Sequence, residues 1–387
     1  MSGEVRVHEV ASGGGGVADG ADVTGLSGET PAALRADGAD VTGLSGETLA
    51  ALRAAGLDAR EVVRVVRAAL DEDFRYGPDV TSAATVAGRT VSADMVAREA
   101  GVLAGVPVAL AVLDLIAEYL GGAGADVRAA AHGNGTAAGG QVLAPDGSRA
   151  MARDLHPVGN ALVADGARIG AGEAVLRVSG PAPAVLGAER TMLNFLTHLS
   201  GIATATRAWA DAIAGTGAAV RDTRKTTPGL RELEKYAVRC GGGVNHRMGL
   251  GDAALVKDNH VAAAGGVAAA VRAVQSATRL AGAGPVVESA GAGIVIEVEC
   301  DSVAQVREAL AAGARFLLLD NMPVGSLREA VTVARAYDGV LLEASGGLRL
   351  ANAREVARTG VDYLSVGALT HSSRALDLGL DFTAANH

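Results

Sequence analysis

Basic side chains are concentrated in one segment of a chain that is acidic overall. The 387 residues include 34 Lys and Arg but 43 Asp and Glu, a formal net charge of −9. Between Arg221 and Lys257 the balance reverses, since eight basic residues outnumber four acidic ones and His246 lies among them. The eight are Arg221, Arg224, Lys225, Arg231, Lys235, Arg239, Arg247 and Lys257. Like charges held together repel, so this segment predicts an anionic ligand that offsets them.

The basic residues fall into two groups by position. Arg231, Lys235 and Arg239 recur at helical spacing on a predicted helix, where we expect ordinary solvated ion pairs. The others lie at or beside the ends of predicted strands, and they are Arg224, Lys225, His246, Arg247 and Lys257. A guanidinium matches a carboxylate or a phosphate through two parallel bonds, and a lysine is a compact point charge for phosphate. The strand-end group therefore indicates binding of carboxylates and phosphates.

Acidic residues end the next predicted strands. Glu299, Asp320 and Glu343 lie at the ends of apolar runs, and Glu297 is on the same side of its strand as Glu299. Carboxylates among cations suit a Mg²⁺ ion that is bound together with substrate phosphates, and they also suit hydrogen bonds to ribose hydroxyls. Pairing with the neighbouring Arg and Lys side chains is the alternative.

Two later strand ends carry glycine. Ser345, Gly346 and Gly347 close one apolar run, and Ser365 and Gly367 close the last one. Such ends expose main-chain N–H groups, and the late strands of an α/β barrel commonly build a phosphate site in this way. We therefore expect a phosphate to bind between these two segments.

The candidates for a nucleophile carry less weight. Cys240 ends a predicted helix and has no evident base partner, so we expect a buried structural thiol. Lys257 ends a strand and could form a Schiff base with a carbonyl substrate, as the lysines of barrel aldolases do. This covalent chemistry stays open as an alternative to ionic binding.

The second half of the chain repeats a strand–helix unit. Apolar runs that end in a charged or Gly-rich segment lie at 218–225, 254–260, 294–300, 316–321, 340–347 and 363–369. Such repeats predict a parallel sheet with crossover helices, and reactive residues at the strand ends favour an α/β barrel over an open sheet. The first helix of this series is predicted to have Thr227 as its cap, Pro228 at its first position and Gly241 after its end.

The first half is predicted to be a mixture of helices and short strands. Residues 18–35 and 36–53 are copies that differ at one position, Pro31 in the first and Leu49 in the second, and we expect the first copy to be inert and partly disordered. Ser45 and Asp58 are predicted caps of two successive helices. Further along we expect a turn entering an extended segment at 76–82, small strands within 91–183, a helix near 106–120, a loop insertion at 122–160 and a long helix at 188–214.

Composition excludes several classes of protein. Hydrophobic residues make up 49% and charged residues 20%, as in globular chains, while 3% aromatics and a negative net charge argue against a nucleic-acid binder. Two cysteines, Cys240 and Cys300, cannot form a disulfide framework, so we expect a cytoplasmic protein. The longest apolar run, 102–113, is shorter than the roughly 20 residues of a membrane span, and the N-terminus lacks a secretory pattern.

The motifs taken together resemble one family. The second half contains, in order, ERTMLNFLTHLSGIATAT, RDTRKTTPGLRELEKYAVRCGGGVNHRMGLGDAALVKDNH, IEVEC, LLLDN, LEASGG and VGALTHS. These segments closely resemble quinolinate phosphoribosyltransferases, and EDFRYGPDVTS and VAREAGVLAG resemble that family's amino-terminal domain. The resemblance implies a smaller α/β sandwich followed by an incomplete α/β barrel. It implies a sandwich at 45–188, a barrel at 189–372 and a segment at 373–387 that returns to the sandwich. The chain departs from the family in a leader at 1–44, with the duplication continuing to 53, in the insertion at about 122–160 and in a Gly/Ala-rich insertion at about 279–292.

The resemblance also implies a role for each motif residue. Quinolinate would be held by Thr223, Arg224, His246, Arg247 and Lys257, together with Arg190 of the partner subunit in a homodimer. Phosphoribosyl pyrophosphate would contact Lys225 and Lys257, and Glu299 and Asp320 would bind the ribose and help to place Mg²⁺. The 5-phosphate would lie against Ser345, Gly346, Ser365 and Gly367. Catalysis would depend on Lys225, Lys257, Glu299 and Asp320.

The implied reaction transfers phosphoribosyl to quinolinate with loss of CO₂ and gives nicotinate mononucleotide and pyrophosphate, a step of NAD biosynthesis. It proceeds through an oxocarbenium-like sugar and needs no strong general base, which agrees with the lack of a Ser–His–Asp pattern. Two other functions stay open. One is a paralogous phosphoribosyltransferase of the same fold with a different acceptor, and the other is a non-catalytic ligand-binding or scaffold protein.

Overall fold

A computed structural model describes residues 41–120, 156–280, 285–286 and 294–383. Residues 1–40 of the predicted leader, most of the insertion at 122–160 and much of the insertion at 279–292 lie outside these residues. The helices are α1 (Gly46–Ala54), α2 (Ala59–Phe74), α3 (Val80–Thr85), α4 (Val106–Leu115), α5 (Ala117–Leu120), α7 (Ala182–Ile213), α8 (Arg231–Cys240), α9 (Asp258–Ala264), α10 (Val267–Leu280), α11 (Val303–Ala311), α12 (Val324–Ala334), α13 (Leu350–Ala357) and α14 (Ala368–His371). The strands are β1 (Thr90–Ala97), β2 (Gly101–Val102), β3 (Val158–Ala161), β4 (Arg168–Ile169), β5 (Ala174–Pro181), β6 (Ala219–Arg221), β7 (Ala253–Val256), β8 (Pro285–Val286), β9 (Ile294–Cys300), β10 (Phe316–Asp320), β11 (Leu341–Ser345), β12 (Tyr363–Ser365) and β13 (Leu378–Phe382).

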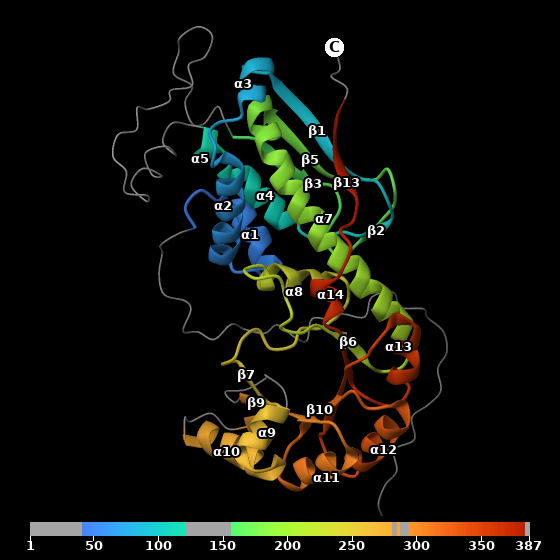
Figure 1. The fold of residues 1–387 in the computed structure, drawn as a ribbon. Coiled ribbons are helices and arrows are strands. Elements are labelled where there is room, and N and C mark those ends of the chain that lie inside the picture. The colour runs from blue at the N-terminus through green and yellow to red at the C-terminus, as the bar shows by residue number, and fades with distance from the viewer. Residues whose placement is uncertain (1–40, 121–155, 281–284, 287–293, 384–387) are drawn as a thin grey trace, which may run out of the picture. The chain divides into compact units, whose positions relative to one another are not determined.

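The second half of the chain forms a parallel sheet, as the repeated strand–helix units predicted. Its strands run in the order β6–β12–β11–β10–β9–β7, and β8 also pairs with β9. Each of the six predicted apolar runs supplies one strand of this order. β6 and β7 stand at its two ends and do not pair with each other in the described part of the chain, so the barrel is incomplete. Figure 1 shows α10, α11 and α12 together on one side of this sheet.

The register of the parallel sheet places its polar residues on one face. The paired positions are Glu299–Leu318–Glu343 in one row, and Asp320–Ser345 and Ser365–Arg221 two residues further along the strands. Side chains alternate between the two faces of a strand, so these residues point the same way. The residues between them, such as Val298, Leu317 and Leu342, are fully buried on the opposite face. The helices therefore cover an apolar face, and the polar face is left for a site.

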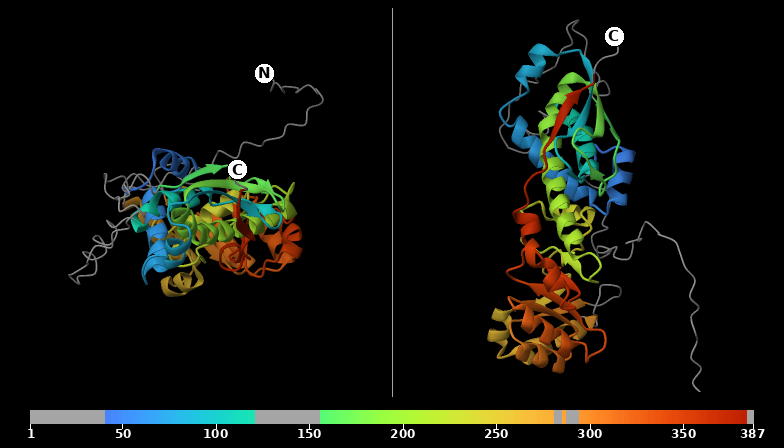
Figure 2. Two further views of the ribbon diagram at one scale, coloured as in Figure 1. Left: turned by 90° about the horizontal axis from the view of Figure 1, so that it is seen from above. Right: turned by 90° about the vertical axis from the view of Figure 1, so that its right-hand side faces the viewer.

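A second sheet is antiparallel and combines both ends of the described chain. Its order is β13–β1–β5–β3, so the last strand of the chain pairs with the first. Figures 1 and 2 both show β13, in red, within this sheet. The long helix α7 packs against α4 and β5 and also against α8 and β6, so one helix contacts elements around both sheets.

Both predicted caps of the first half are confirmed, and one predicted segment there is wrong. Ser45 and Asp58 cap α1 and α2 with their side-chain oxygens, as expected. The predicted extended segment within 76–82 is wrong, because Asp79 accepts hydrogen bonds from the N–H groups of Thr81 and Ser82 and starts α3. An aspartate in this position satisfies the free N–H groups of a first helical turn.

Two helices of the second half begin elsewhere than predicted. α7 begins at Ala182, earlier than residue 188. Thr227 is not the cap of α8, because its carbonyl accepts the N–H of Leu230 in a turn and the helix begins only at Arg231. The Thr227 N–H donates to Glu234 Oε2 at 3.0 Å, so an acid from inside the helix stabilises this turn.

The interior contains several charged side chains besides apolar ones. Those buried in the described residues include Asp222, Glu234, Lys235, Glu297 and Glu343. The prediction of a solvated ion pair is therefore wrong for Lys235, which is fully buried on α8 because Asp222 receives its ammonium there. No helix among the described residues combines the length and the apolar character needed to cross a bilayer.

Candidate active site

The carboxyl ends of β9 to β12 bring four predicted site residues to one edge of the sheet. Asp320 and Ser345 are direct neighbours in the register, and Ser365 and Glu299 lie on the same face of the flanking strands. Lys257 follows β7, and its Nζ lies 3.5 Å from Glu299 Oε2. Parallel strands end at a common edge, so the sequence prediction that these residues meet has a direct structural basis.

Two arginines, Arg224 and Arg247, interact electrostatically, and neither forms an ion pair with any acid that the structure describes. Arg224 follows β6, and Arg247 precedes β7. The Nε atoms of both are buried and have no hydrogen-bond acceptor among the described residues. Burial lowers the pKa of Arg247, and the nearby charge of Arg224 lowers it further, while the charges of Asp252 and Glu297 offset this in part. The two guanidiniums therefore repel each other. The arrangement suits a bound anion with more than one carboxylate.

A hollow of about 140 Å³ lies at the ends of β11 and β12. It is lined by Thr223, Lys225, Ser345, Gly346, Gly347, Leu348, Ser365, Val366, Gly367, Ala368 and His371. All the residues predicted to cradle a phosphate therefore meet in one hollow, with Lys225 beside them. His371 is a further lining residue that the sequence reasoning did not single out.

A side chain at either of two glycines of this hollow would require a neighbouring side chain to move. Gly346 has φ +82°, and a Cβ added there would lie 2.2 Å from Asn321 Oδ1. A Cβ on Gly367 would lie 2.9 Å from Cδ of Lys225. Glycine therefore keeps the main chain close to the lysine and leaves its N–H groups accessible to a ligand.

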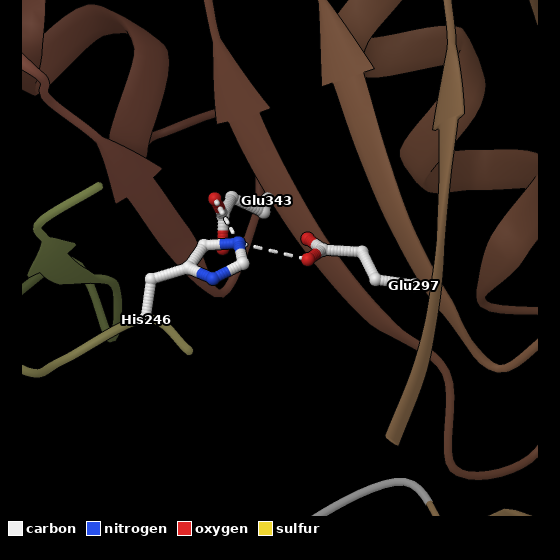
Figure 3. A group of neighbouring side chains, drawn as sticks. All are labelled: His246, Glu297 and Glu343. Carbon is white, nitrogen blue, oxygen red and sulfur yellow. Dashed lines mark ion pairs between the residues drawn. The ribbon is translucent and has the colours of Figure 1, made fainter. Parts of the chain in front are cut away.

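His246 lies below this edge in a buried cluster with two glutamates. Figure 3 shows the Glu297 and Glu343 carboxylates directed toward its ring. Nε2 is 2.9 Å from Glu297 Oε2 and 3.7 Å from Glu343 Oε1, and Nδ1 accepts the main-chain N–H of Arg247 at 2.7 Å. Burial lowers the pKa of His246 to about 4, so the ring is neutral. Direct contact with a substrate carboxylate would require the ring to release one of these partners.

Arg221 occupies the interior of the barrel beside this cluster. Its NH1 donates to Glu343 Oε2 at 2.7 Å, and its guanidinium lies over the rings of Phe316 and Tyr363. Burial lowers the pKa of Arg221, but the charges of Glu343 and Glu297 outweigh this and raise it overall. The sequence reasoning counted Arg221 among the basic residues without giving it a role. The sequence did contain a usable signal. Side chains alternate between the two faces of a strand, and Val220 is apolar, so Arg221 falls on the opposite, polar face of β6.

Two carboxylate sets are candidates for a metal ion. In the described ranges, the side chains of His246, Glu297 and Glu343 are close enough together to hold one. Glu343 is already paired with Arg221, and Glu297 is already in contact with His246. These side chains therefore have protein partners and form a structural network rather than an open metal site. The other set, Glu299 and Asp320, consists of oxygen donors at neighbouring strand ends, and Asn321 Nδ2 orients Asp320 at 2.6 Å. Hard oxygen donors at an accessible edge fit Mg²⁺.

The other predicted residues lie in different surroundings. Thr223 lines the hollow, and its Oγ1 accepts the main-chain N–H of Lys225 at 3.0 Å. Arg190 is exposed on α7 and is not among the residues that line the hollow. Within a single chain, the described structure therefore gathers the predicted site residues except Arg190.

Comparisons with known proteins agree with this geometry. Residues 202–381 match the profile of the quinolinate phosphoribosyl transferase C-terminal domain, and residues 149–200 match that of the N-terminal domain. The chain is 50% identical over 319 residues to the carboxylating nicotinate-nucleotide pyrophosphorylase of Mycobacterium leprae (strain TN), which covers 82% of this chain and 95% of that protein. The chain belongs to the quinolinate phosphoribosyltransferase family.

Solved structures of similar proteins have the same fold as this family member. The nicotinate-nucleotide pyrophosphorylase from Francisella tularensis aligns with a TM-score of 0.67 and 33% identity, covering 84% of this chain and 96% of that one. The enzyme of the same name from Ehrlichia chaffeensis aligns with a TM-score of 0.65 and 30% identity, covering 83% and 98%. These likenesses confirm the predicted fold class, a smaller α/β domain followed by an incomplete α/β barrel.

Cys240 is expected to be unreactive in this quinolinate phosphoribosyltransferase family member. Burial, together with the charge of Asp165, raises the pKa of its thiol to about 12, so almost none of it is thiolate at pH 8. We expect its alkylation by iodoacetamide at pH 8 to be about 10³-fold slower than that of an unperturbed thiol. Peptide mass spectrometry measures the rate, with the urea-unfolded chain as the fast control. Rapid alkylation in the folded protein would restore Cys240 as a candidate nucleophile.

Proposed function

We propose that this chain transfers the phosphoribosyl group of phosphoribosyl pyrophosphate to quinolinate with loss of CO₂, forming nicotinate mononucleotide and pyrophosphate. The observation that carries the proposal is the pair formed by Arg224 and Arg247, whose buried Nε donors lack an acceptor in the part of the chain that the structure describes. Arg224 stands in sequence between Thr223 and Lys225, both of which line the glycine-bearing hollow. A site for carboxylates thus adjoins a site for phosphate.

Quinolinate fits the arginine pair by charge and shape. Its two carboxylates are on neighbouring ring carbons, and each can accept two parallel bonds from one guanidinium. Lys257 supplies a further cation from the end of β7, and Arg190 of the partner subunit completes the set. His246 acts on this group through the main chain of Arg247, whose N–H it accepts.

Phosphoribosyl pyrophosphate would place its 5-phosphate in the hollow. Main-chain N–H groups near Gly346 and Gly367 and the ammonium of Lys225 are its donors there. Glu299 and Asp320 are placed to accept hydrogen bonds from the ribose hydroxyls. This pose puts the anomeric carbon between the hollow and the arginine pair, and so within reach of the pyridine nitrogen.

The residues promote the reaction by holding charges in place. The C1′–O bond breaks, and its electron pair leaves with pyrophosphate, while the pyridine nitrogen forms the new bond to C1′. The carbon–carbon bond at ring position 2 then breaks, CO₂ leaves, and the electron pair on that carbon takes a proton from water. Mg²⁺ held by Glu299 and Asp320 would supply charge stabilisation for the leaving pyrophosphate. Lys225 and Lys257 offset the remaining negative charge.

We further infer that the active protein is a cytoplasmic homodimer. Met248 and Leu250 lie within three residues of Arg247, and Leu250 is 73% exposed. An exposed apolar side chain of this kind could be buried against a second copy of the chain. The partner's α7 would then bring its exposed Arg190 to this edge. Cys240 and Cys300 are both free, which suits a reducing compartment.

The test is an incubation of the purified protein with quinolinate, phosphoribosyl pyrophosphate and Mg²⁺. We expect CO₂, pyrophosphate and nicotinate mononucleotide in equal amounts, and no product when nicotinate replaces quinolinate, because nicotinate lacks the second carboxylate. Faster turnover of nicotinate or another acceptor would favour the paralogous activity. A covalent adduct trapped at Lys257 by borohydride and substrate would favour the Schiff-base alternative.

A further inference from the structure

Lys235 is a fully buried lysine in the middle of α8, on the face that packs into the protein. Its ammonium donates to the carboxylate of Asp222 and, at 2.8 Å, to the main-chain carbonyl of His246. The residue therefore joins three separate segments, which are α8, the end of β6 and the loop that precedes β7. None of these contacts involves a group that would touch a substrate.

The Asp222 carboxylate accepts hydrogen bonds from α8 and from the loop that precedes β7. Its Oδ1 accepts the main-chain N–H of His246 at 2.8 Å, and its Oδ2 accepts Nδ2 of Asn245 at 2.5 Å. Lys235 contributes a third donor, so the carboxylate has the surroundings of an ionised group. Both main-chain polar groups of His246 are thus held by one buried ion pair.

The two segments held in this way carry the arginine pair. Asp222 is followed immediately by Thr223, Arg224 and Lys225, and His246 is followed by Arg247. We propose that Asp222 and Lys235 are positioning residues that fix the spacing between the guanidiniums of Arg224 and Arg247. The proposal deepens the proposed function and rests on it, since the spacing matters only if one ligand bridges both arginines.

Stability alone is a poor explanation for this pair. Burial raises the pKa of Asp222 and lowers that of Lys235, so desolvation opposes the charged form of each. Buried ion pairs are often replaceable by apolar side chains without loss of stability. Apolar side chains could not, however, form hydrogen bonds with the N–H and the carbonyl of His246. The bonds from Asp222 and Lys235 to these two groups fix the main chain at His246 and so the position of the next residue, Arg247.

The hollow for the phosphate has an independent support. Thr370 Oγ1 donates to the carbonyl of Lys225 at 2.8 Å, and the strand ends of β11 and β12 form the remaining wall. Loss of the ion pair should therefore disturb the spacing of the arginines more than the hollow. This difference predicts a selective effect on one substrate.

The test compares Lys235→Met, the double variant Lys235→Met/Asp222→Asn and the control Leu233→Ala. Leu233 is 1% exposed on the same helix, so its truncation loosens α8 without touching the ion pair. We expect Lys235→Met to raise KM for quinolinate by about 30-fold and KM for phosphoribosyl pyrophosphate by less than about threefold. The double variant, which leaves no unpaired buried charge, should recover urea resistance but keep the raised KM for quinolinate. Leu233→Ala should lose urea resistance with both KM values within about twofold of the wild type.

Two outcomes would overturn the positioning role. One is a KM for quinolinate that returns to the wild-type value together with stability in the double variant. The other is an equal rise in KM in Leu233→Ala. If Lys235→Met does not fold, the double variant and the control still decide between these results. Failure of the proposed function is a separate observation, because the wild-type protein would then form no mononucleotide at all.

Discussion

Replacing Arg247 with alanine is expected to raise KM for quinolinate by about 10³-fold while changing KM for phosphoribosyl pyrophosphate by less than about fivefold. The Nε of Arg247 is buried and has no acceptor within the described ranges, so a substrate carboxylate would supply its missing partner. Bonds between a buried guanidinium and a carboxylate are charge-assisted, and truncation also leaves the carboxylate unpaired. The phosphate hollow has no contribution from Arg247, so the donor should bind almost normally.

Initial rates with each substrate varied in turn measure both KM values. Arg307→Ala is the matched control, because Arg307 lies on α11 in an exposed 3.7 Å pair with Glu329 of α12. It should leave both KM values unchanged. An equal loss of both substrates in Arg247→Ala would show that the arginine pair does not define a separate quinolinate site.

The sequence predicted the strand ends of this site well, for a physical reason. Glu299, Asp320, Ser345 and Ser365 each lie at the end of an apolar run, and parallel strands always end at a common edge. Local spacing therefore sufficed to bring them together. The glycines of the hollow were predictable in the same way, since Gly346 and its neighbours follow a strand directly.

The buried network below the site could not be read from local spacing. Lys235 shows the helical periodicity of a surface cation, and only the contact of α8 with the end of β6 places Asp222 against it. Glu343 and Arg221 are on strands that do not pair with each other, so their contact depends on the strand order, which places β6 and β11 on either side of β12. The start of α8 was missed because Glu234, from within the helix, stabilises the turn at Thr227.

The largest expected effect on stability comes from Arg221→Met. The methionine keeps much of the side-chain volume between Phe316 and Tyr363 but removes the charge that offsets Glu343, whose side chain is fully buried. Removing one partner of a buried ion pair costs about 3–5 kcal/mol, a large part of the 5–15 kcal/mol by which a typical domain is stable. Urea denaturation followed by circular dichroism measures the free energy of unfolding.

The pH dependence distinguishes this mechanism from a simple packing defect. Burial raises the pKa of Glu343, and the charge of Arg221 lowers this pKa in the wild type. Loss of Arg221 therefore raises the pKa of Glu343 further. A group whose pKa is raised by folding binds its proton more tightly in the folded state, so its contribution to stability falls as the pH rises. The deficit of Arg221→Met should therefore be larger at pH 8 than at pH 5, while Arg307→Met, at the exposed pair, should cost about 0.5 kcal/mol or less at both. A deficit that is the same at both pH values would mean that the lost contacts with the rings, and not the unpaired carboxylate, destabilise the variant.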